Sequence, residues 1–418
     1  MGPARARARH RGQLTVASGG IRLSARVGRT RISASAAAAQ RARELRAAGV
    51  DIIELAQGEP DFNTPDHVIE AAARAMREGQ THYTQVDGTP ALKAAIIAKF
   101  QRENGLAFKP ENISAGAGGK QILHNLLMAT LDAGDEVVIP APSWVAYADI
   151  AHYAEGVPVW VPTKPENGFK LRPEELERAI TPRTRWLMLN SPSNPSGAVY
   201  SAEELRALAP VLERHSHVWT ISDDMYEHVL FDGRKFATLA AVAPQLGDRI
   251  FTVNGVSKTY AMTGWRLGYG AGPAELVRAM ARLQAQSSLN PSSVSQAAAI
   301  AALNGPQEVV RERNAIFQSR RDALVKRLKA IAGLACRPPE GAFYVYVSCA
   351  GWLGKRTPQG KVLQTDGDVT AWLLEGGLAL PNGAGYGLSP YFRVSFAADQ
   401  ALLDRACDRL AALAATLG

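Results

Sequence analysis

The chain has 418 residues, of which 46% are hydrophobic and 21% are charged, a composition typical of globular proteins. No apolar run approaches the roughly 20 residues of a membrane-spanning helix, so no membrane association is expected. The net charge of +8 comes from the first 43 residues, which contain ten arginines and no acid and leave −2 on the rest, so a nucleic-acid-binding protein is not expected either.

The N-terminal composition and the cysteines bear on where the protein works. Residues 1–25 lack the apolar core of a secretory signal, and their composition fits a transit peptide, a basic disordered arm or an upstream start codon. We favour a disordered extension. The three cysteines form no CxxC pair and no metal-ligand spacing, and the eight histidines are scattered. We therefore expect reduced thiols, a cytoplasmic protein and no metal site.

From about residue 63 onward, helix-like and strand-like segments alternate along the chain. The first helix is expected at 65–78, with Thr64 as its N-cap and Pro65 in its first turn. Further helices are expected at 90–104, 120–132 and 201–215, and strands at 135–140, 157–162, 185–190, 217–222, 249–254 and 266–272. Such alternation predicts an α/β fold, in which a mainly parallel central sheet is covered by helices on both faces.

The C-terminal part of the chain has a different pattern. After Pro273 the chain is mainly helical up to about Ile331. Short strands are then expected at 342–347 and 391–396, followed by an amphipathic helix from Asp399. This change in pattern predicts a second, smaller α+β domain.

Polar residues and glycines follow several of the predicted strands. Asn194, Asp223 and Lys258 each come just after one of them. Gly118 and Gly119 separate another short apolar segment from the helix that follows. Because ligands bind at the carboxyl ends of the strands in an open α/β sheet, we expect these residues to meet at one edge.

The chemistry of this set suggests pyridoxal phosphate (PLP), which carries an aldehyde and a phosphate. A buried lysine that loses its proton, such as Lys258, can form a Schiff base with a carbonyl. Arg266, eight residues later, suits a phosphate. The helix that opens at Gly118 and Gly119 offers free backbone amides to the same phosphate. A nucleotide-binding P-loop is excluded, because Gln121 follows the lysine and the first glycine spacing is wrong.

Other side chains suit the ring of that cofactor. Asp223 would pair with the ring nitrogen and keep it protonated. Asn194 and Tyr226 could hydrogen-bond the ring hydroxyl, and Trp144 could stack on the ring face. Taken singly, each has a commoner explanation: a turn, a strand end, a core aromatic, or a solvated lysine in the case of Lys258. Their joint placement favours the cofactor site.

The motifs that carry these residues resemble the aspartate aminotransferase family, class I enzymes of PLP fold-type I. More narrowly, the chain resembles the bacterial subgroup that acts on aspartate and, in some members, on prephenate. The resemblance extends from about Arg29 to the C-terminus and rests on LAQGEPDFNTP (55–65), YTQVDGTPALK (83–93), GAGGKQ (116–121), APSWVAY (141–147), NSPSNPSGAVY (190–200), SDDMYEH (222–228), NGVSKTYAMTGWRLGY (254–269) and YFRVSF (391–396).

The resemblance implies a domain division and an assembly. It implies an N-terminal segment, 26–62, that packs with a small C-terminal domain, 310–418, and a large cofactor-binding domain, 63–309. It also implies a homodimer with active sites at the interface, in which Tyr83 reaches the phosphate of the neighbouring subunit's cofactor.

The resemblance further implies how substrates bind. Arg393 would bind the substrate α-carboxylate through two parallel hydrogen bonds, assisted by the Gly58 amide. Lys120, beside the phosphate, would contribute to binding the distal carboxylate. Arg31 and Ser35, in the segment that closes over the substrate, stand where relatives carry Lys and Thr. Trp144 and Asn194 are expected to contact substrate as well as cofactor.

Some positions depart from the family pattern. They are Ile32, Ser35, Pro381, Asn382 and Phe396. These departures bear on the dicarboxylate preference and on the closing segment, and they leave the cofactor chemistry untouched.

The leading prediction is therefore a PLP-dependent aminotransferase that moves the amino group between aspartate, and in some cases glutamate or prephenate, and a 2-oxo acid such as 2-oxoglutarate or oxaloacetate. Lys258 would be both the Schiff-base anchor and the general acid/base. The alternatives are an aromatic-amino-acid or alanine aminotransferase of the same fold, or an eliminating relative. A cofactor-sensing regulator is disfavoured, because the N-terminal extension is too short for a DNA-binding module.

Overall fold

The computed structural model describes residues 21, 23–29 and 34–418. Most of the predicted extension 1–25 therefore lies outside the described residues. None of the helices in the described part is both long enough and apolar enough to cross a membrane.

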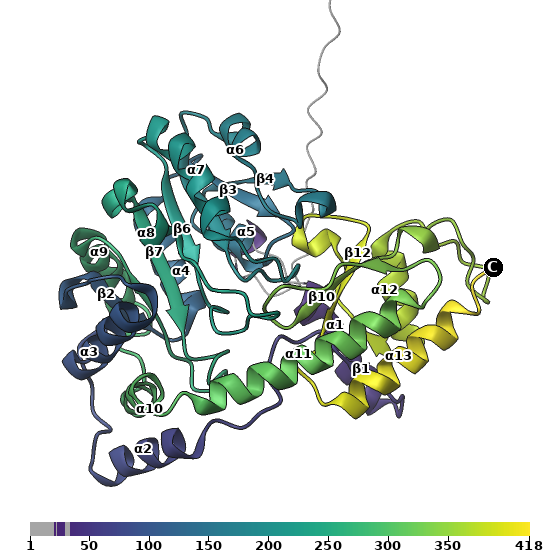
Figure 1. Ribbon diagram of the computed structural model, residues 1–418, viewed down its shortest axis with the longest axis horizontal. Helices are drawn as coiled ribbons and strands as arrows, with labels where there is room; N and C mark the ends of the chain where they lie inside the picture. The colour runs from purple at the N-terminus through teal and green to yellow at the C-terminus, as the bar shows by residue number, and fades with distance from the viewer. Residues whose placement is uncertain (1–20, 22, 30–33) are drawn as a thin grey trace, which may run out of the picture.

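The centre of the molecule is a seven-stranded sheet with strand order β2-β8-β7-β6-β5-β3-β4 (Figure 1). Its strands are β2 (Ile113–Gly116), β3 (Glu136–Ala141), β4 (Val157–Pro162), β5 (Thr184–Asn190), β6 (Trp219–Asp223), β7 (Ile250–Gly255) and β8 (Gly268–Ala271). The pairs from β7 to β4 are parallel, whereas β8 runs antiparallel to both β2 and β7. The predicted α/β fold with a mainly parallel sheet is confirmed.

Helices cover both faces of this sheet because its strands are apolar on both sides. Val137 and Ile139 of β3 pack with α4 (Gly119–Thr130), α5 (Ala146–Tyr153) and α9 (Ala274–Ala285). Val138, between them, points the other way, to the face covered by α6 (Pro173–Ala179), α7 (Ala202–Arg214) and α8 (Leu239–Val242). A third cluster joins β2 and β8 to α2 (Asp66–Arg77), α3 (Pro90–Lys99) and α10 (Ser293–Asn304).

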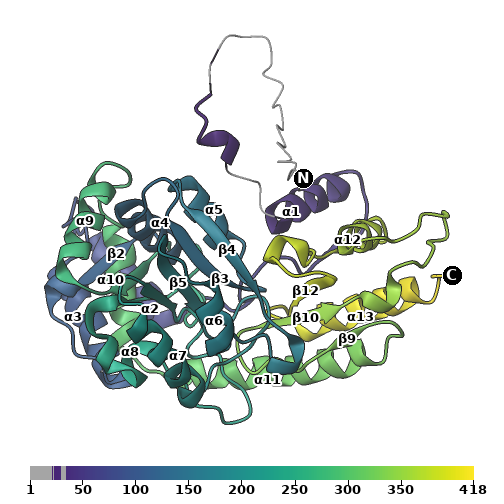
Figure 2. The ribbon, with the colours of Figure 1, turned by 90° about the horizontal axis from the view of Figure 1, so that it is seen from above.

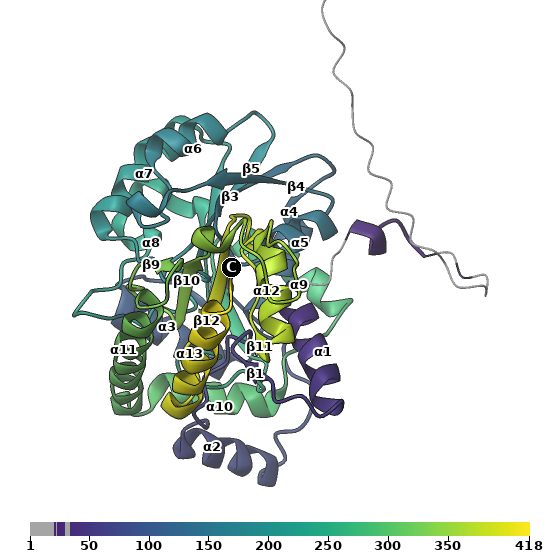
Figure 3. The ribbon, with the colours of Figure 1, turned by 90° about the vertical axis from the view of Figure 1, so that its right-hand side faces the viewer.

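The C-terminal region forms its own small sheet. Its strands, in the order β12-β10-β9, are antiparallel: β9 (Ala335–Cys336), β10 (Tyr344–Ser348) and β12 (Tyr391–Ser395). The helices around it are α11 (Glu308–Lys329), α12 (Asp366–Glu375) and α13 (Gln400–Ala414). In Figure 1 the long α11 runs from the half that holds the large sheet to the half that holds the small one, and Figure 3 shows it beside α13.

The N-terminal segment reaches this C-terminal region. Strand β1 (Ile53–Glu54) pairs in parallel with β11 (Leu378–Ala379). Helix α1 (Ala34–Ala47) lies on the same side of the molecule as α12 (Figure 2). The remaining short helices are η1 (Val27–Arg29), η2 (Phe100–Asn104), η3 (Pro110–Asn112), η4 (Pro165–Asn167), η5 (Pro244–Arg249), η6 (Ala350–Trp352) and η7 (Ala384–Tyr386).

Two details of the predicted helices were wrong. Thr64 is not the N-cap of α2: the cap position is Pro65, and the Thr64 hydroxyl donates to the Ala261 carbonyl at 3.0 Å, in the loop after Lys258. The helix expected at 90–104 is α-helical only up to Lys99 and continues as the π-helical turn η2. In both cases the side chains concerned lie near the candidate site. Contacts with other segments of the chain there outweigh the conformational preference of the local sequence.

Candidate active site

A cavity of about 550 Å³ opens at the carboxyl ends of the central strands. Asn194 and Lys258, which follow β5 and β7, line it together with Asp223, the last residue of β6. Gly119 joins them from the start of α4, and Arg393 enters from β12 of the small sheet. The structure thus brings together side chains that the sheet-edge argument placed side by side, with Arg393 added from the opposite sheet.

Lys258 is largely enclosed by protein and lines the cavity. Its Nζ donates a hydrogen bond to the Gly58 carbonyl at 2.5 Å. Enclosure lowers the pKa of Lys258 to about 8, against the opposing charge of Glu59, and the positive charge of Arg393 adds to the lowering. About a tenth of the amine is therefore free of its proton at pH 7, far more than for a solvated lysine of pKa about 10.4, and only this free amine is a nucleophile.

Asp223 is buried at the floor of the cavity. Its Oδ2 accepts a hydrogen bond from the Tyr147 hydroxyl at 2.6 Å, and its Oδ1 accepts one from the Met225 backbone amide at 3.2 Å. Burial raises the pKa of Asp223 to about 6, although the Tyr147 hydrogen bond opposes the rise. The carboxylate is thus mostly ionised at neutral pH in a place where a cationic ligand group would be favoured.

Arg393 is a buried arginine whose partners are all uncharged. It is 3% exposed, and its guanidinium donates to Asn194 Oδ1 at 2.8 Å and to the Ala56 carbonyl. The rings of Tyr344 and Tyr386 lie 4.4 and 5.2 Å from it, and its Nε has no partner. A buried charge without a counter-charge is costly, so this arrangement favours an anion supplied by a ligand.

Asn194 contacts this arginine directly, and Tyr226 contacts Tyr344, whose ring lies against the same arginine. Because Asn194 Oδ1 accepts from Arg393, its Nδ2 group remains as a donor for a ligand. The Tyr226 hydroxyl lies 2.9 Å from that of Tyr344, and both residues line the cavity.

The start of α4 and Arg266 form an anion-binding corner. Gly118 has φ +88°, and a Cβ at this position would lie 2.5 Å from Nη2 of Arg266, so only glycine lets the two come so close. Arg266 itself has φ +52°, and its Nη1 donates to the Thr263 carbonyl at 2.8 Å. Backbone amides at a helix N-terminus beside a guanidinium suit a phosphate.

Lys120 and Trp144 form the next part of the lining. The Lys120 ammonium lies 5.1 Å from the centre of the Trp144 ring. Burial and the positive charge of Arg266 lower the pKa of Lys120, while Asp149 opposes the shift. Lys120 therefore adds a third cationic side chain to those of Arg266 and Arg393 in the cavity lining.

Four predicted residues are not among those that line the cavity. One of them, Gly118, directly precedes the lining residue Gly119. Tyr83 is 87% exposed and does not line the cavity of its own chain. The prediction was that Tyr83 reaches the cofactor of the neighbouring subunit. Arg31 lies outside the described residues. Ser35 belongs to α1, and its side chain also lies outside what the structure describes.

Sequence reasoning missed Tyr147, Tyr344 and Arg43, all of which line the cavity. Tyr147 could have been found, because it stands one helical turn after Trp144 in a motif already singled out. Tyr344 lies in a predicted strand whose partner was unknown. Arg43, from α1, had no signal apart from the general excess of arginine in that part of the chain.

Residues 50–410 match the family described as aminotransferase class I and II. The chain belongs to this family. Among the relatives of this class I and II aminotransferase is the aspartate/prephenate aminotransferase of Cereibacter sphaeroides (strain ATCC 17029 / ATH 2.4.9), which is 52% identical over 94% of this chain and 99% of its own length.

Solved structures of aminotransferases superpose closely on this one. The aspartate aminotransferase from Rhizobium meliloti has a TM-score of 0.93 and 53% identity, covering 96% of this chain and 100% of that one. The aspartate aminotransferase from Thermus thermophilus with maleate has a TM-score of 0.87 and 41% identity, covering 94% of this chain and 100% of that one. The fold-type I architecture and the aminotransferase activity expected from the resemblance are thereby confirmed.

Proposed function

We propose that this aminotransferase uses PLP and transfers the amino group of aspartate to a 2-oxo acid such as 2-oxoglutarate or oxaloacetate. The observation that carries the proposal is the set of separate cationic corners around Lys258: Arg266 beside Gly118, Arg393 on the small sheet, and Lys120 beside Trp144. One suits the cofactor phosphate, and two suit the carboxylates of a dicarboxylic amino acid.

The residues of the cavity fit PLP. Arg266 and the Gly119 amide would hold the phosphate beside the turn at Gly118, whose own amide already donates to the Gly116 carbonyl at 2.7 Å, and Asp223 would pair with the ring nitrogen. Asn194 and Tyr226 would bind the ring hydroxyl, and Trp144 would face the ring. When bound, PLP supplies an aldehyde that Lys258 can capture and a ring that accepts electrons from the substrate α-carbon.

The protein's own contribution is binding, orientation and proton transfer. Arg393 would grip the substrate α-carboxylate, and its contact with Asn194 would fix the guanidinium plane. Lys258, through its Nζ, would accept the α-proton of the substrate and return it, a role for which a pKa near neutrality is suited.

The depressed pKa of Lys258 predicts how cofactor capture by the protein freed of PLP depends on pH. A pKa of about 8 means that the reactive amine falls about tenfold for each pH unit below that value, whereas a solvated lysine would do so from about 10.4. We expect the rate of PLP uptake, followed by absorbance, to rise with pH and level off above about pH 8. A rise that continues to pH 10 would contradict an enclosed Lys258.

The dicarboxylate assignment is tested at Lys120. In Lys120→Ala we expect kcat/KM for aspartate to fall by about 10- to 100-fold, as for loss of a charge-assisted hydrogen bond of roughly 1.5–3 kcal/mol. Turnover of alanine, which has no distal carboxylate, should change little. Aspartate, glutamate, alanine, phenylalanine and prephenate (through its amino form) would be compared in one panel. Equal losses for aspartate and alanine would favour the aromatic or alanine aminotransferase alternatives.

Two observations in relatives support the same substrate class. A relative with 52% identity is named an aspartate/prephenate aminotransferase, and the Thermus thermophilus enzyme was solved with maleate, a four-carbon dicarboxylate. Prephenate use by this chain belongs to the proposal, with Arg31 and Ser35 as the residues that would serve it.

The proposal extends to assembly and location. We propose a homodimer, in which the exposed Tyr83 reaches the phosphate of the neighbouring subunit's cofactor. We also propose the division into 26–62, 63–309 and 310–418 and a cytoplasmic location, which fits the three free cysteines.

A further inference from the structure

A cluster of charged and polar side chains, two of them buried and three half-buried, lies just outside the cavity lining. Its members, here called the buried charge network, are Lys99, Glu103, Asn104, Glu227 and His228. Lys99 ends α3, the next two belong to the π-helical turn η2, and the last two lie in the turn after β6. None of the five lines the cavity, so none of them is expected to touch the substrate or the cofactor.

The network is closely connected. The Lys99 ammonium forms an ion pair with Glu227, lies 3.6 Å from Glu103 and donates to Asn104 Oδ1 at 2.8 Å. Asn104 Nδ2 in turn donates to Glu227 Oε2 at 2.9 Å. The π-helical turn explains these contacts, because it brings residue i+5 back over residue i and so places Asn104 above Lys99.

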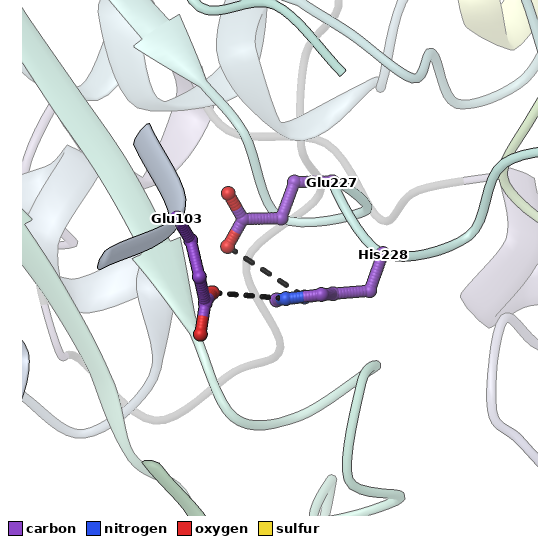
Figure 4. Close-up of side chains that lie close together, drawn as sticks. All are labelled: Glu103, Glu227 and His228. Carbon is purple, nitrogen blue, oxygen red and sulfur yellow. Dashed lines mark hydrogen bonds and ion pairs between the residues drawn. The ribbon is translucent and has the colours of Figure 1, made fainter. Parts of the chain in front are cut away.

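His228 joins the two glutamates, as Figure 4 shows. Its Nε2 lies 3.0 Å from Glu103 Oε2, and its Nδ1 lies 3.6 Å from Glu227 Oε1. The ligand atoms of these three residues lie within 4.8 Å of one another, a spacing compatible with a metal ion. The Lys99 ammonium, however, already lies against both carboxylates and takes the place that a cation would occupy.

Stability alone is a poor reason for such a network. The Lys99 and Glu227 side chains are 1% and 3% exposed. Removing two charges from water costs several kcal/mol each, and well-packed apolar residues are often as stable as a buried ion pair. A buried network of this kind is better suited to fixing one arrangement of the segments that it joins.

Those segments carry the reactive groups of the cavity. On one side, Glu227 and His228 directly follow Tyr226 in the turn after β6, the strand that ends at Asp223. On the other side, Glu227 Oε1 accepts from Asn254 Nδ2 at 2.8 Å, at the end of β7. The turn that carries Lys258 is therefore tied to the turn that directly follows Asp223.

A second tie lies immediately beyond the lysine. His228 Nδ1 and the hydroxyl of Thr259 lie 3.1 Å apart, and Thr259 is the residue after Lys258. Thr259 is 6% exposed, so water offers its hydroxyl little alternative. Asn254 and Thr259 thus hold the backbone of Lys258 on both sides.

We propose that the buried charge network is a positioning device for Lys258, which acts through Asn254 and Thr259 to fix the lysine relative to Asp223. The network residues are positioning residues and not catalytic ones. The inference rests on the proposed role of Lys258 but adds residues that contact neither substrate nor cofactor.

The decisive pair of variants is Thr259→Val and Thr259→Ser. Valine keeps the shape of threonine and removes the hydroxyl, whereas serine keeps the hydroxyl. We expect Thr259→Val to lower kcat by about 10- to 100-fold with little change in KM, since an error of about 1 Å in a reacting group has an effect of this size. Thr259→Ser should recover most of the loss.

A readout in the protein freed of PLP separates this inference from the proposed function. The pH dependence of Lys258 labelling by an amine-reactive probe, followed by peptide mass spectrometry, should have its midpoint near pH 8 in the parent protein. In Thr259→Val the midpoint should move up by about one pH unit, because a lysine that is less firmly held gains access to water. The labelling midpoint can be measured even if the parent protein is inactive with every donor. Such inactivity would contradict the proposed function but not the positioning of Lys258.

Thr184→Val is the matched control. Thr184 is also fully buried, and its hydroxyl lies 3.4 Å from the buried carboxylate of Glu136, but it stands at the start of β5, at the opposite end of the strand from the cavity. It should lose stability in a thermal melt and keep both kcat and the labelling midpoint. Glu103→Gln, at the most exposed acid of the network, should lower kcat in the same way as Thr259→Val. If the Thr259 and Glu103 variants behave like Thr184→Val, the network is purely structural and the inference is overturned.

Discussion

Replacement of Lys258 by alanine should lower kcat for transamination by about 1,000- to 10,000-fold, because it removes the group that would carry the α-proton. The change should leave the fold intact, since it deletes an amine whose enclosure already disfavours its charge and lowers its pKa to about 8. The measurement is the rate of a single half-reaction with aspartate, together with PLP absorbance before and after dialysis. We expect the variant to bind PLP but to lose it on dialysis, as the covalent attachment is gone.

Lys170→Ala is a suitable control for Lys258→Ala. Lys170 pairs with Glu204 at 2.6 Å and does not line the cavity, so its loss should leave both the rate and the retention of PLP unchanged. If Lys258→Ala kept the parent rate, or retained PLP through dialysis as firmly as the parent, another residue would have to hold the cofactor. That result would contradict the proposed attachment of PLP to Lys258.

Replacement of Arg393 by glutamine should lower kcat/KM for every amino acid donor by about 30- to 3,000-fold, the equivalent of roughly 2–5 kcal/mol for loss of a buried charge partner. The reason is that the guanidinium is buried among Asn194, the Ala56 carbonyl and two aromatic rings, with no carboxylate of the protein among these partners. Steady-state kinetics with aspartate and alanine would show the loss for both, in contrast to the selective effect expected at Lys120.

Arg320→Gln controls for the general cost of losing a buried arginine. Arg320 is also largely buried, but it already has an internal partner in Asp61, with both guanidinium nitrogens at 2.8 Å from the carboxylate, and it does not line the cavity. It should lower thermal stability and leave KM for the donors unchanged. Unaltered kinetics in Arg393→Gln would show that the α-carboxylate binds elsewhere.

The residues at the sheet edge could be predicted because their placement follows from local pattern. A strand that ends before Asp223 or Lys258 puts that residue at the carboxyl edge whatever the rest of the chain does. The direction of β8 could not be read in this way: the segment between β7 and β8 lacks a helical crossover, and its return as an antiparallel strand depends on pairing with β2.

Contacts between distant segments mark the limit of such reasoning. Arg393 comes from a sheet that shares no strand with the central one, and its role was implied by family resemblance and not by its spacing. The hydrogen bond between Tyr147 and Asp223 and the tie between His228 and Thr259 likewise join segments whose proximity no periodicity indicates. Thr64 was misassigned for the same reason, since its hydroxyl is used by the loop after Lys258.

The origin of the cavity walls in two separate sheets has a consequence for how such an enzyme can change over time. Asp223 ends a strand of the central sheet, and Lys258 and Arg266 lie in the segment that joins two of its strands, whereas Arg393 and Tyr344 belong to the small sheet. Mutations in the N-terminal segment, which carries Arg31 and Ser35, can therefore alter which amino acid is accepted while the cofactor pocket stays intact. The residues that would hold the cofactor are thus separate from those that would select the substrate. New substrate preferences can therefore arise in a lineage while the cofactor chemistry stays the same.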